Sequence, residues 1–369
     1  MKKVAIISRH AISNYGSFFQ AVALEKAVKK LGYEACTINY INKKEKSYNM
    51  VKIDIKNSKW NQNIIRKIIF YIIDGINRFI QFNKFEKYRR VEMNLTDEFN
   101  QLEDIKKKKI NADIYCTGSD QVWNETINNE LDLAYFLDFL EKEDKPIAYA
   151  ASFGKDYINK EKIEIVKKEL EKYKFISVRE NQGVNILKDI GIDSKQVLDP
   201  TLLLNAKDWL EMASQKKCKR KFILIYQIHK NSAMIDYAKK YAKKHGYDIY
   251  NISVSFIDKK KGIKLKWCPS YREVLWLFNN ATCIITDSFH ATAFSINLNK
   301  NFVTFLPKKS TSRNRSILKL FDLESRSIEN CEDFETPEKN IDYEKVNVIL
   351  EEERKKSLDY LDYMLRNVN

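Results

Sequence analysis

Glycine is scarce in this sequence, with 9 among 369 residues, far below the usual share of about 7%. Each glycine is therefore expected to have a backbone task. Those that follow predicted helices, and are expected to be C-caps, are Gly32, Gly191 and Gly246. Those that follow predicted strands are Gly16, Gly118 and Gly154. None of the loops after strands matches the GxGxxG or Walker A pattern, which argues against a dinucleotide or P-loop site.

The sequence also lacks the patterns of a disulfide or zinc scaffold and the long apolar run of a membrane span. Its 6 cysteines form no CxxC pair and show no zinc-ligand spacing. No stretch approaches the ~18 consecutive apolar residues of a transmembrane helix, and the N-terminus turns polar too soon for a signal peptide. We therefore expect a cytoplasmic protein, at most peripheral at the inner face of the membrane, with no metal site.

Positive charge is abundant but dispersed. The 65 Lys and Arg residues outnumber the 50 Asp and Glu residues, which gives a formal net charge of +15. A nucleic-acid-binding protein concentrates its charge on one motif or face, whereas here basic and acidic residues are interleaved along the chain. No nucleic-acid partner is predicted, although a diffuse positive field still attracts anionic substrates.

Short apolar segments alternate with amphipathic ones, which is typical of βαβ units and a parallel sheet. The predicted strands are residues 4–8, 35–40, 114–117, 147–151, 175–178, 196–198, 222–226, 248–252, 283–286 and 302–305. The predicted helices include residues 17–31, 160–173, 182–190, 232–244, 271–278, 316–321 and 343–365. Because 369 residues exceed one ordinary core, we expect two α/β domains, at 1–195 and 196–330, and a helical segment at 331–369.

A charged helical insertion at residues 43–109 interrupts this rhythm in the first domain. Within it, residues 64–80 carry Ile, Phe and Tyr on one helical face, with Arg66, Lys67 and Arg78 on the other. One interpretation is a basic amphipathic helix in weak contact with a membrane surface. The other is a helix packed on its own domain, and the sequence leaves both open.

The most informative segment is residues 283–294. An apolar strand leads directly into a polar turn with Asp287, Ser288 and His290, and the turn opens a helix. In open α/β sheets ligands bind at the carboxyl ends of strands, and a helix start favours an anionic group. Of the 4 histidines, only His290 lies in such a segment. We therefore place the centre of the site at His290, whose imidazole can move a proton.

Other polar residues follow predicted strands and are expected to face the same crevice. They are His10, Asn14, Ser119, Asp120, Gln121 and Arg179 in the first half, and Arg313 and Arg315 in the second. Guanidinium groups in a cleft bind carboxylate or phosphate in bidentate fashion. Together with an imidazole and a few carboxylates, they indicate transfer chemistry on an anionic donor.

Structural roles stay open for several of these residues. Asp287 is equally compatible with a turn or a helix N-cap, and Arg179 with an ion pair to Glu180. The paired arginines after residue 312 fit a solvated helix start as well as a binding site. His10 fits the cleft and the core equally.

Six short motifs occur in order along the chain. They are Asn14-Tyr15-Gly16 with Gln20, Gly118-Ser119-Asp120-Gln121-Val122-Trp123-Asn124, Ala148-Tyr149-Ala150-Ala151-Ser152-Phe153-Gly154, Ser177-Val178-Arg179-Glu180, Leu198-Asp199-Pro200-Thr201 and Thr286-Asp287-Ser288-Phe289-His290. Together they resemble the polysaccharide pyruvyl transferase family, over nearly the whole chain outside residues 43–109. The chain departs from some members at Ser288, where they have arginine, and at Ala291, where they have glycine.

This resemblance implies two Rossmann-like domains facing each other across a cleft in a GT-B-like arrangement, with the acceptor on the first domain and the donor on the second. It also implies transfer of pyruvate from phosphoenolpyruvate, a co-substrate with no further cofactor, onto two hydroxyls of a sugar as a cyclic ketal. The product is a cell-surface polysaccharide, such as an exopolysaccharide or cell-wall glycan, or its precursor. In such enzymes an arginine at the place of Arg179 and a histidine at the place of His290 are associated with the donor.

Residue roles follow from the resemblance and the strand-end positions. Catalysis is predicted for His290 as proton donor, and for Asp287 and Asp120 as acceptors of a hydroxyl proton or partners of the sugar. Donor binding is predicted for Arg179, Arg313, Arg315 and Ser288, and acceptor binding for His10, Asn14, Gly16, Ser119 and Gln121. The alternatives are a GT-B-type glycosyltransferase with a nucleotide-sugar donor and a non-catalytic assembly protein docked on a membrane.

Overall fold

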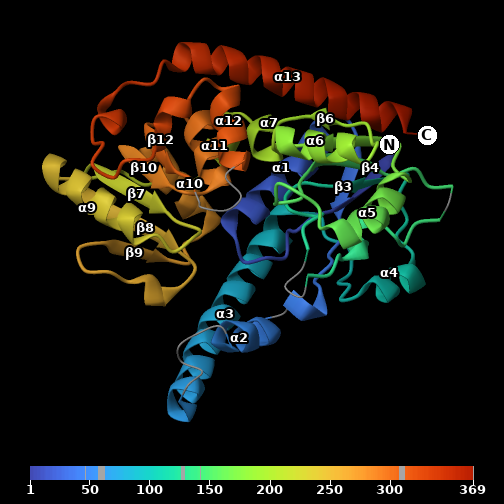
Figure 1. Cartoon of the computed structure of the whole chain (residues 1–369), viewed down its shortest axis with the longest axis horizontal. Coiled ribbons are helices and arrows are strands. Elements are labelled where there is room, and N and C mark those ends of the chain that lie inside the picture. Colours follow the sequence, from blue (N-terminus) through green and yellow to red (C-terminus); the bar gives the residue numbers. More distant parts are fainter. Residues whose placement is uncertain (46, 57–62, 126–128, 142, 307–311, 369) are drawn as a thin grey trace.

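Two parallel sheets organise the chain, one in each half, with helices on both faces (Figure 1). The computed structural model describes residues 1–45, 47–56, 63–125, 129–141, 143–306 and 312–368. Each sheet has six strands. This architecture confirms the predicted α/β class with two Rossmann-like units.

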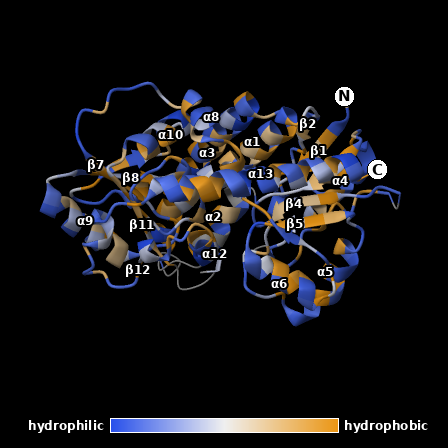
Figure 2. Ribbon diagram, turned by 90° about the horizontal axis from the view of Figure 1, so that it is seen from above, coloured by the Kyte–Doolittle hydropathy of each residue, from blue (hydrophilic) through white to orange (hydrophobic). Residues whose placement is uncertain are grey.

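The first sheet has the strand order β2-β1-β3-β4-β5-β6. Its strands are β1 (Lys3–Ile7), β2 (Glu34–Thr37), β3 (Ile114–Thr117), β4 (Ile147–Ala151), β5 (Phe175–Val178) and β6 (Lys195–Gln196). Its helices include α1 (Tyr15–Lys30), α5 (Ile163–Leu170) and α6 (Asn181–Asp189). The central strands are covered on both faces, so Val4, Ala5, Ile6 and Ile7 are all buried and apolar without alternation. Figure 2 shows β4 and β5 in the orange of hydrophobic residues.

The second sheet has the order β12-β11-β10-β7-β8-β9. Its strands are β7 (Phe222–Tyr226), β8 (Asp248–Ser253), β9 (Lys264–Trp267), β10 (Cys283–Thr286), β11 (Phe302–Phe305) and β12 (Ser327–Ile328). Its helices include α7 (Pro200–Leu203), α8 (Ala206–Glu211), α9 (Ser232–His245), α10 (Tyr271–Asn280), α11 (Phe289–Asn297) and α12 (Ser312–Leu320). The sequence pattern does not predict β9, because this edge strand alternates lysine with apolar residues that are only half-buried.

The described part of the predicted insertion, residues 43–109, includes the α-helices α2 (Ser47–Lys56), α3 (Ile64–Glu92) and α4 (Leu102–Lys108). Its residues 46 and 57–62 lie outside the described part of the chain. α2 packs beside α3, and the two project from the body of the molecule (Figure 1).

α3 continues well past residue 80, where the predicted helix ends. Its second half packs on α1, where Phe85 lies 4.9 Å from Tyr15 and Tyr88 lies 6.2 Å from Phe18 between ring centroids. The sequence pattern alone does not reveal this contact, because the two segments are far apart in the chain.

Direct packing joins the two halves. Phe19 of α1 lies 5.0 Å from Phe294 of α11 between ring centroids, and both pack on Trp209 of α8. One apolar cluster therefore runs from the first sheet to the second.

The last helix, α13 (Tyr343–Asn367), crosses both halves along one side of the molecule (Figures 1 and 2). Near its middle Arg354 Nε donates to the Leu202 carbonyl at 2.7 Å. Near its end the Tyr363 ring packs 5.4 Å from Phe175 of the first sheet. Among the described residues, no helix combines the length and the apolar composition needed to cross a bilayer.

Candidate functional site

The carboxyl ends of β1, β3, β4 and β5 lead into loops that meet the start of α11 from the second half. The centre of this meeting point is Arg179, which follows β5. Its Nη2 lies 3.2 Å from Asp120 Oδ1, its Nη1 lies 3.1 Å from Asp199 Oδ2, and its Nε lies 3.2 Å from Glu180 Oε2. The Arg179 guanidinium also stacks 4.7 Å from the ring centroid of Phe289 on α11. One fully buried cation thus holds three carboxylates and contacts both halves.

The charges in this cluster lower the pKa values of two of its carboxylates, Asp120 and Asp199. Burial alone raises the pKa of Asp120, but Arg179, His290 and the Ser17 hydroxyl outweigh it and lower the pKa to about 2. Burial is likewise outweighed at Asp199, whose pKa His290 and Arg179 hold well below its usual range. The pKa of Arg179 is raised despite its burial, because the three carboxylates stabilise its charge. Asp120, Asp199 and Arg179 are therefore ionised at neutral pH.

His290 comes from the opposite half and lies in the first turn of α11. Ser288 caps this helix, with its hydroxyl accepting from the Ala291 amide at 3.4 Å. The Nε2 atom of His290 is buried, lies 3.7 Å from Asp199 Oδ2 and has no hydrogen-bond partner, since that distance exceeds hydrogen-bonding range. On the other side of the ring, a Cβ added at Gly16 would lie 2.6 Å from His290 Cγ. Gly16 therefore lets the imidazole approach α1.

Arg313 and Arg315 lie in different surroundings, although both belong to the first turn of α12. Arg313 is half-buried, and its buried Nε has no partner. Burial and the nearby Arg179 lower its pKa, while Glu180 and Asp120 act in the opposite direction. The side chain of Arg315 is 63% exposed and lies 4.0 Å from Glu329 at the surface. The structure brings Arg313, and not Arg315, to the cluster.

Asp287 is engaged away from His290. Its carboxylate accepts the backbone amides of Ile228 and His229 at 2.7 and 2.9 Å and lies 3.1 Å from the His229 ring. Its own carbonyl accepts from Asn314 at 3.1 Å. The Asp287 carboxylate thus holds the loop after β7 by hydrogen bonds. The N-cap of α11 is Ser288 and not Asp287.

His10 and Asn14, which were both predicted to bind the acceptor, make hydrogen bonds within the protein. His10 is fully buried, with Nδ1 3.0 Å from the Ser8 carbonyl and Nε2 3.4 Å from Asn39 Oδ1. Burial and the charge of Arg89 lower its pKa to about 4. Asn14 is the N-cap of α1 and accepts from the Gly16 amide at 2.7 Å. The structure therefore places His10 in the core and Asn14 in a cap.

Ser119 and Gln121 flank Asp120 on the loop after β3. The Ser119 hydroxyl donates to the Ala150 carbonyl at 2.9 Å and lies 3.5 Å from Asp199 Oδ2. Gln121 accepts from Asn124 at 2.8 Å. Asp120 itself has a positive φ of 73° and accepts from the Ser17 hydroxyl at 2.6 Å. Ser119 thus joins the cluster, whereas Gln121 stabilises the loop.

Asp199, Glu180 and Arg9 belong to this region, although the strand-end pattern does not single them out. Asp199 caps α7 through the Thr201 amide at 2.9 Å while it also binds Arg179. The signal for Asp199 is present in the sequence, because it lies in one of the family-like motifs. Arg9 follows β1, pairs with Glu45 and gives no such signal.

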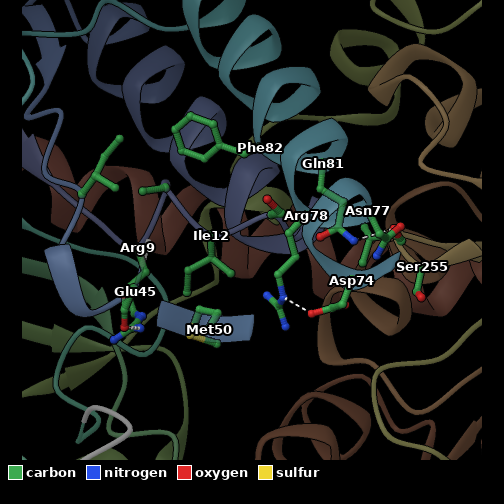
Figure 3. A pocket seen from close by; sticks show the side chains of 14 residues that line it. Arg9, Ile12, Glu45, Met50, Asp74, Asn77, Arg78, Gln81, Phe82 and Ser255 are labelled. Carbon is green, nitrogen blue, oxygen red and sulfur yellow. Dashed lines mark hydrogen bonds and ion pairs between the residues drawn. The ribbon is translucent and has the colours of Figure 1, made fainter. Parts of the chain in front are cut away.

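A pocket of about 470 Å³ lies next to Arg9, and its lining does not include Arg179, Asp120 or His290. Figure 3 shows Arg9 and Glu45 on one side of it and Asp74, Asn77, Arg78 and Gln81 of α3 on the other. Ile12, Met50 and Phe82 add apolar surface, and Ser255 comes from the second half.

Burial works against the charge of Arg9, but Tyr135, Glu45 and Asp120 raise its pKa. Arg9 therefore links the pocket to the cluster.

The arrangement favours acid–base and anion-binding chemistry. In the described part of the chain, no group of three or more His, Cys, Asp or Glu side chains is placed to hold a metal ion. The groups that are present are an imidazole with an unpartnered nitrogen, two guanidiniums and ionised carboxylates that orient them.

Solved structures with the same architecture include two proteins that were solved with UDP. MnaA of S. aureus, solved with UDP, is 10% identical with a TM-score of 0.54 and aligns over 99% of this chain and 97% of its own. The UDP-GlcNAc 2-epimerase of Methanocaldococcus jannaschii, in complex with UDP-GlcNAc and UDP, is 13% identical with a TM-score of 0.52 over 99% of both chains. At this identity the likeness shows the fold, which is GT-B-like. Fold and site thus define a two-domain α/β protein whose candidate site lies where the halves meet.

The sequence profile of polysaccharide pyruvyl transferases matches residues 14–308. The chain belongs to this family and is a transferase, with polysaccharide pyruvylation as its general activity. A search of curated proteins gives no significant match.

Proposed function

We propose that this protein moves pyruvate from phosphoenolpyruvate onto two hydroxyls of a sugar, in a cell-surface polysaccharide or its precursor, as a cyclic ketal. The observation that carries the proposal is a pair of buried side-chain nitrogens that make no hydrogen bond, His290 Nε2 and Arg313 Nε. Both side chains lie near enough to Asp120 to lower its pKa. An anionic donor bound there would meet one group that gives a proton and one that stabilises charge.

The reaction balances with these groups. His290, as imidazolium, gives its Nε2 proton to the methylene carbon of phosphoenolpyruvate, and the adjacent carbon becomes an oxocarbenium-like electrophile. The first sugar hydroxyl adds to that carbon, and its proton returns to His290. Phosphate then leaves, the second hydroxyl closes the ketal, and its proton goes to phosphate or solvent. The net products are the ketal and inorganic phosphate.

The carboxylates contribute to this chemistry by holding other groups of the site in place. A group with a pKa of about 2 is a poor base at neutral pH, so Asp120 orients Arg179 rather than accepting the hydroxyl proton. Asp199 faces the His290 ring, with Oδ2 3.7 Å from Nε2. Asp287 holds the loop after β7. Arg313 neutralises negative charge on the donor, while Arg179, which three carboxylates already bind, holds the loops of the site in place.

The acceptor enters through the pocket next to Arg9. Its volume of about 470 Å³ is within the ~300–1,000 Å³ usual for small-molecule sites. Its mixture of amides, charged groups and apolar side chains suits a sugar ring. We place the reaction in the cytoplasm, where phosphoenolpyruvate is available, and keep a membrane-surface contact through residues 64–80 as part of the proposal.

Calorimetric titration of the purified protein with phosphoenolpyruvate tests the donor, with UDP as the comparison. We expect phosphoenolpyruvate to bind and His290→Ala to weaken it. Binding of UDP without phosphoenolpyruvate would replace the proposal by a glycosyltransferase with a nucleotide-sugar donor. His290→Ala should also abolish turnover while leaving the thermal unfolding transition unchanged, and full turnover in that variant would remove His290 from the mechanism.

A further inference from the structure

One face of the projecting helix α3 is left uncovered. The apolar side chains on it are between 42% and 69% exposed; they are Ile64, Ile65, Ile68, Ile69, Ile72, Ile76 and Phe79. At about 100° per residue, all of them fall within one arc of about 140° around the helix. We call this surface the α3 stripe, and at 1.5 Å per residue it is about 24 Å long.

Such a surface indicates a docking site. Burying an isoleucine side chain is favourable, so leaving several adjacent ones in water is unfavourable. Single exposed apolar residues need no explanation, but a contiguous apolar patch marks an interaction surface.

The helix cannot rotate to hide the stripe, because its opposite face is already bound to the second half. Gln81 Nε2 donates to the Val254 carbonyl at 2.7 Å. Asn77 Oδ1 accepts from the Trp267 indole at 3.1 Å, and Lys84 Nζ donates to the Cys268 carbonyl at 3.0 Å. Asn77 and Gln81 also line the pocket (Figure 3). α3 thus has the pocket on one face and the stripe on the other.

The charges beside the stripe decide what covers it. Arg66 and Lys67 lie on its flanks, and Lys52 and Lys56 are exposed on the neighbouring α2. The whole chain carries a net charge of +15. A second copy of this chain would bring the same basic side chains against these, which is unfavourable. Anionic lipid headgroups attract Lys and Arg side chains that lie close to the membrane surface, while the acyl region accepts the isoleucines.

We propose that the α3 stripe docks on an anionic lipid surface and that the acceptor sugar is carried on a lipid. The second part rests on the proposed pyruvyl transfer. α3 separates the stripe from the pocket by about one helix diameter, ~10–12 Å. The pocket therefore opens beside the headgroups when the stripe is docked, where it reaches the head of an amphiphilic acceptor.

Vesicle co-sedimentation of the full chain, without substrates, tests the docking. The protein should bind vesicles of phosphatidylcholine with phosphatidylglycerol, bind phosphatidylcholine alone far less, and be released by salt. Ile68→Glu with Ile72→Glu should reduce partitioning by about tenfold or more, since two charges enter the apolar face. The matched control is Ile165→Glu with Val348→Glu, at residues 42% and 60% exposed on α5 and α13, which should bind as the wild type does.

Several results would overturn the docking. They are no binding to the anionic vesicles, equal binding by the stripe variant and the wild type, or a wild-type dimer in analytical ultracentrifugation that the stripe variant abolishes. Circular dichroism checks that the variants fold. If the double variant does not fold, Arg66→Glu should still weaken anionic binding several-fold, and unchanged binding there would equally refute the proposal.

The lipid-borne acceptor has its own test. The stripe variant should keep its turnover on a water-soluble glycoside and lose it on the same sugar anchored in vesicles. Equal turnover by wild type and variant on the anchored sugar would refute this part. Phosphoenolpyruvate calorimetry on the same samples reports separately on the donor, so a failure of pyruvyl transfer is distinguishable from a failure of docking.

Discussion

Gly16 of α1 lies directly against the imidazole of His290 on α11, although 273 residues separate them in the chain. A Cβ at position 16 would lie 2.6 Å from His290 Cγ and 2.9 Å from Cε1, and nearer still to Nδ1. This contact explains why glycine stands in the first turn of a helix, where it costs about 0.5–1 kcal/mol relative to alanine. The two halves of the site thus fit together only because one residue lacks a side chain.

Gly16→Ala should displace the His290 ring and reduce kcat by at least ~100-fold, the usual contribution of a positioned acid–base group. The temperature of thermal unfolding should fall only by the small amount that relieving the local clash costs. Turnover and thermal unfolding of the purified variant check this. Gly75→Ala is the control, because a Cβ at position 75 of α3 meets nothing within 4 Å. Equal activity in the two variants would contradict the role given to the contact.

Arg179→Met should destabilise the fold by roughly 3–5 kcal/mol, because it leaves buried carboxylates without their cation. Urea unfolding at neutral pH measures the loss. Arg90→Met provides the comparison, since the Arg90 side chain is 65% exposed and pairs with Glu86 one turn away on α3, a pair worth about 0.5 kcal/mol or less. A similarly small loss in both variants would show that the Arg179 network does not hold the two halves together.

Arg313→Ala should weaken phosphoenolpyruvate binding by about tenfold or more, the loss expected for one charge-assisted hydrogen bond. Arg315→Ala, two residues further along α12, should bind as the wild type does, because Arg315 faces Glu329 at the surface. Calorimetric titration of both variants with phosphoenolpyruvate measures the two affinities. Equal weakening would mean that the two arginines act through the general positive field rather than through contact.

Acidification should destabilise the protein through His10. Its pKa of about 4 in the folded chain is below the ordinary value of about 6.5, so the unfolded chain binds a proton first. The stability that neutral His10 contributes is therefore complete above about pH 6.5 and falls as the pH approaches 4. Between pH 7 and pH 5 the loss from this residue is about 2 kcal/mol.

Urea unfolding at pH 7 and pH 5 measures this dependence, with His10→Gln as the comparison. Glutamine keeps a hydrogen-bonding side chain without a titrating one, so its stability should fall less over the same interval. Parallel losses in the two proteins would show that His10 does not titrate below its ordinary range.

The parallel architecture could be predicted because each element carries its own periodic pattern. Strands such as β1 and β10 are short apolar runs, and α11 begins where the polar turn after β10 ends. The residues that follow strands were also predictable as a group, since parallel strands deliver their carboxyl ends to one edge. Ser119, Asp120, Arg179 and His290 meet there as expected.

The partners of these residues could not be predicted, because they depend on contacts between distant segments. Asp287 and Asp199 are both acidic residues that follow short apolar segments. Only packing shows that Asp199 faces His290 and Arg179 while Asp287 faces a loop. His10 follows β1 as a site residue would, but the segments around it close over the ring and bury it.

The sequence alone determined the fold class, the family and the place of His290 at the start of a helix after a buried strand, because local periodicity and short ordered motifs are properties of neighbouring residues. Only the tertiary structure shows that Arg313, and not Arg315, turns toward the carboxylate cluster, and that Gly16 makes room for the His290 ring. It alone also shows that α3 forms one wall of the pocket. The reason is geometric: the two arginines lie about 200° apart around α12 at 100° per residue. Which of those directions is buried depends on where the other half of the chain lies.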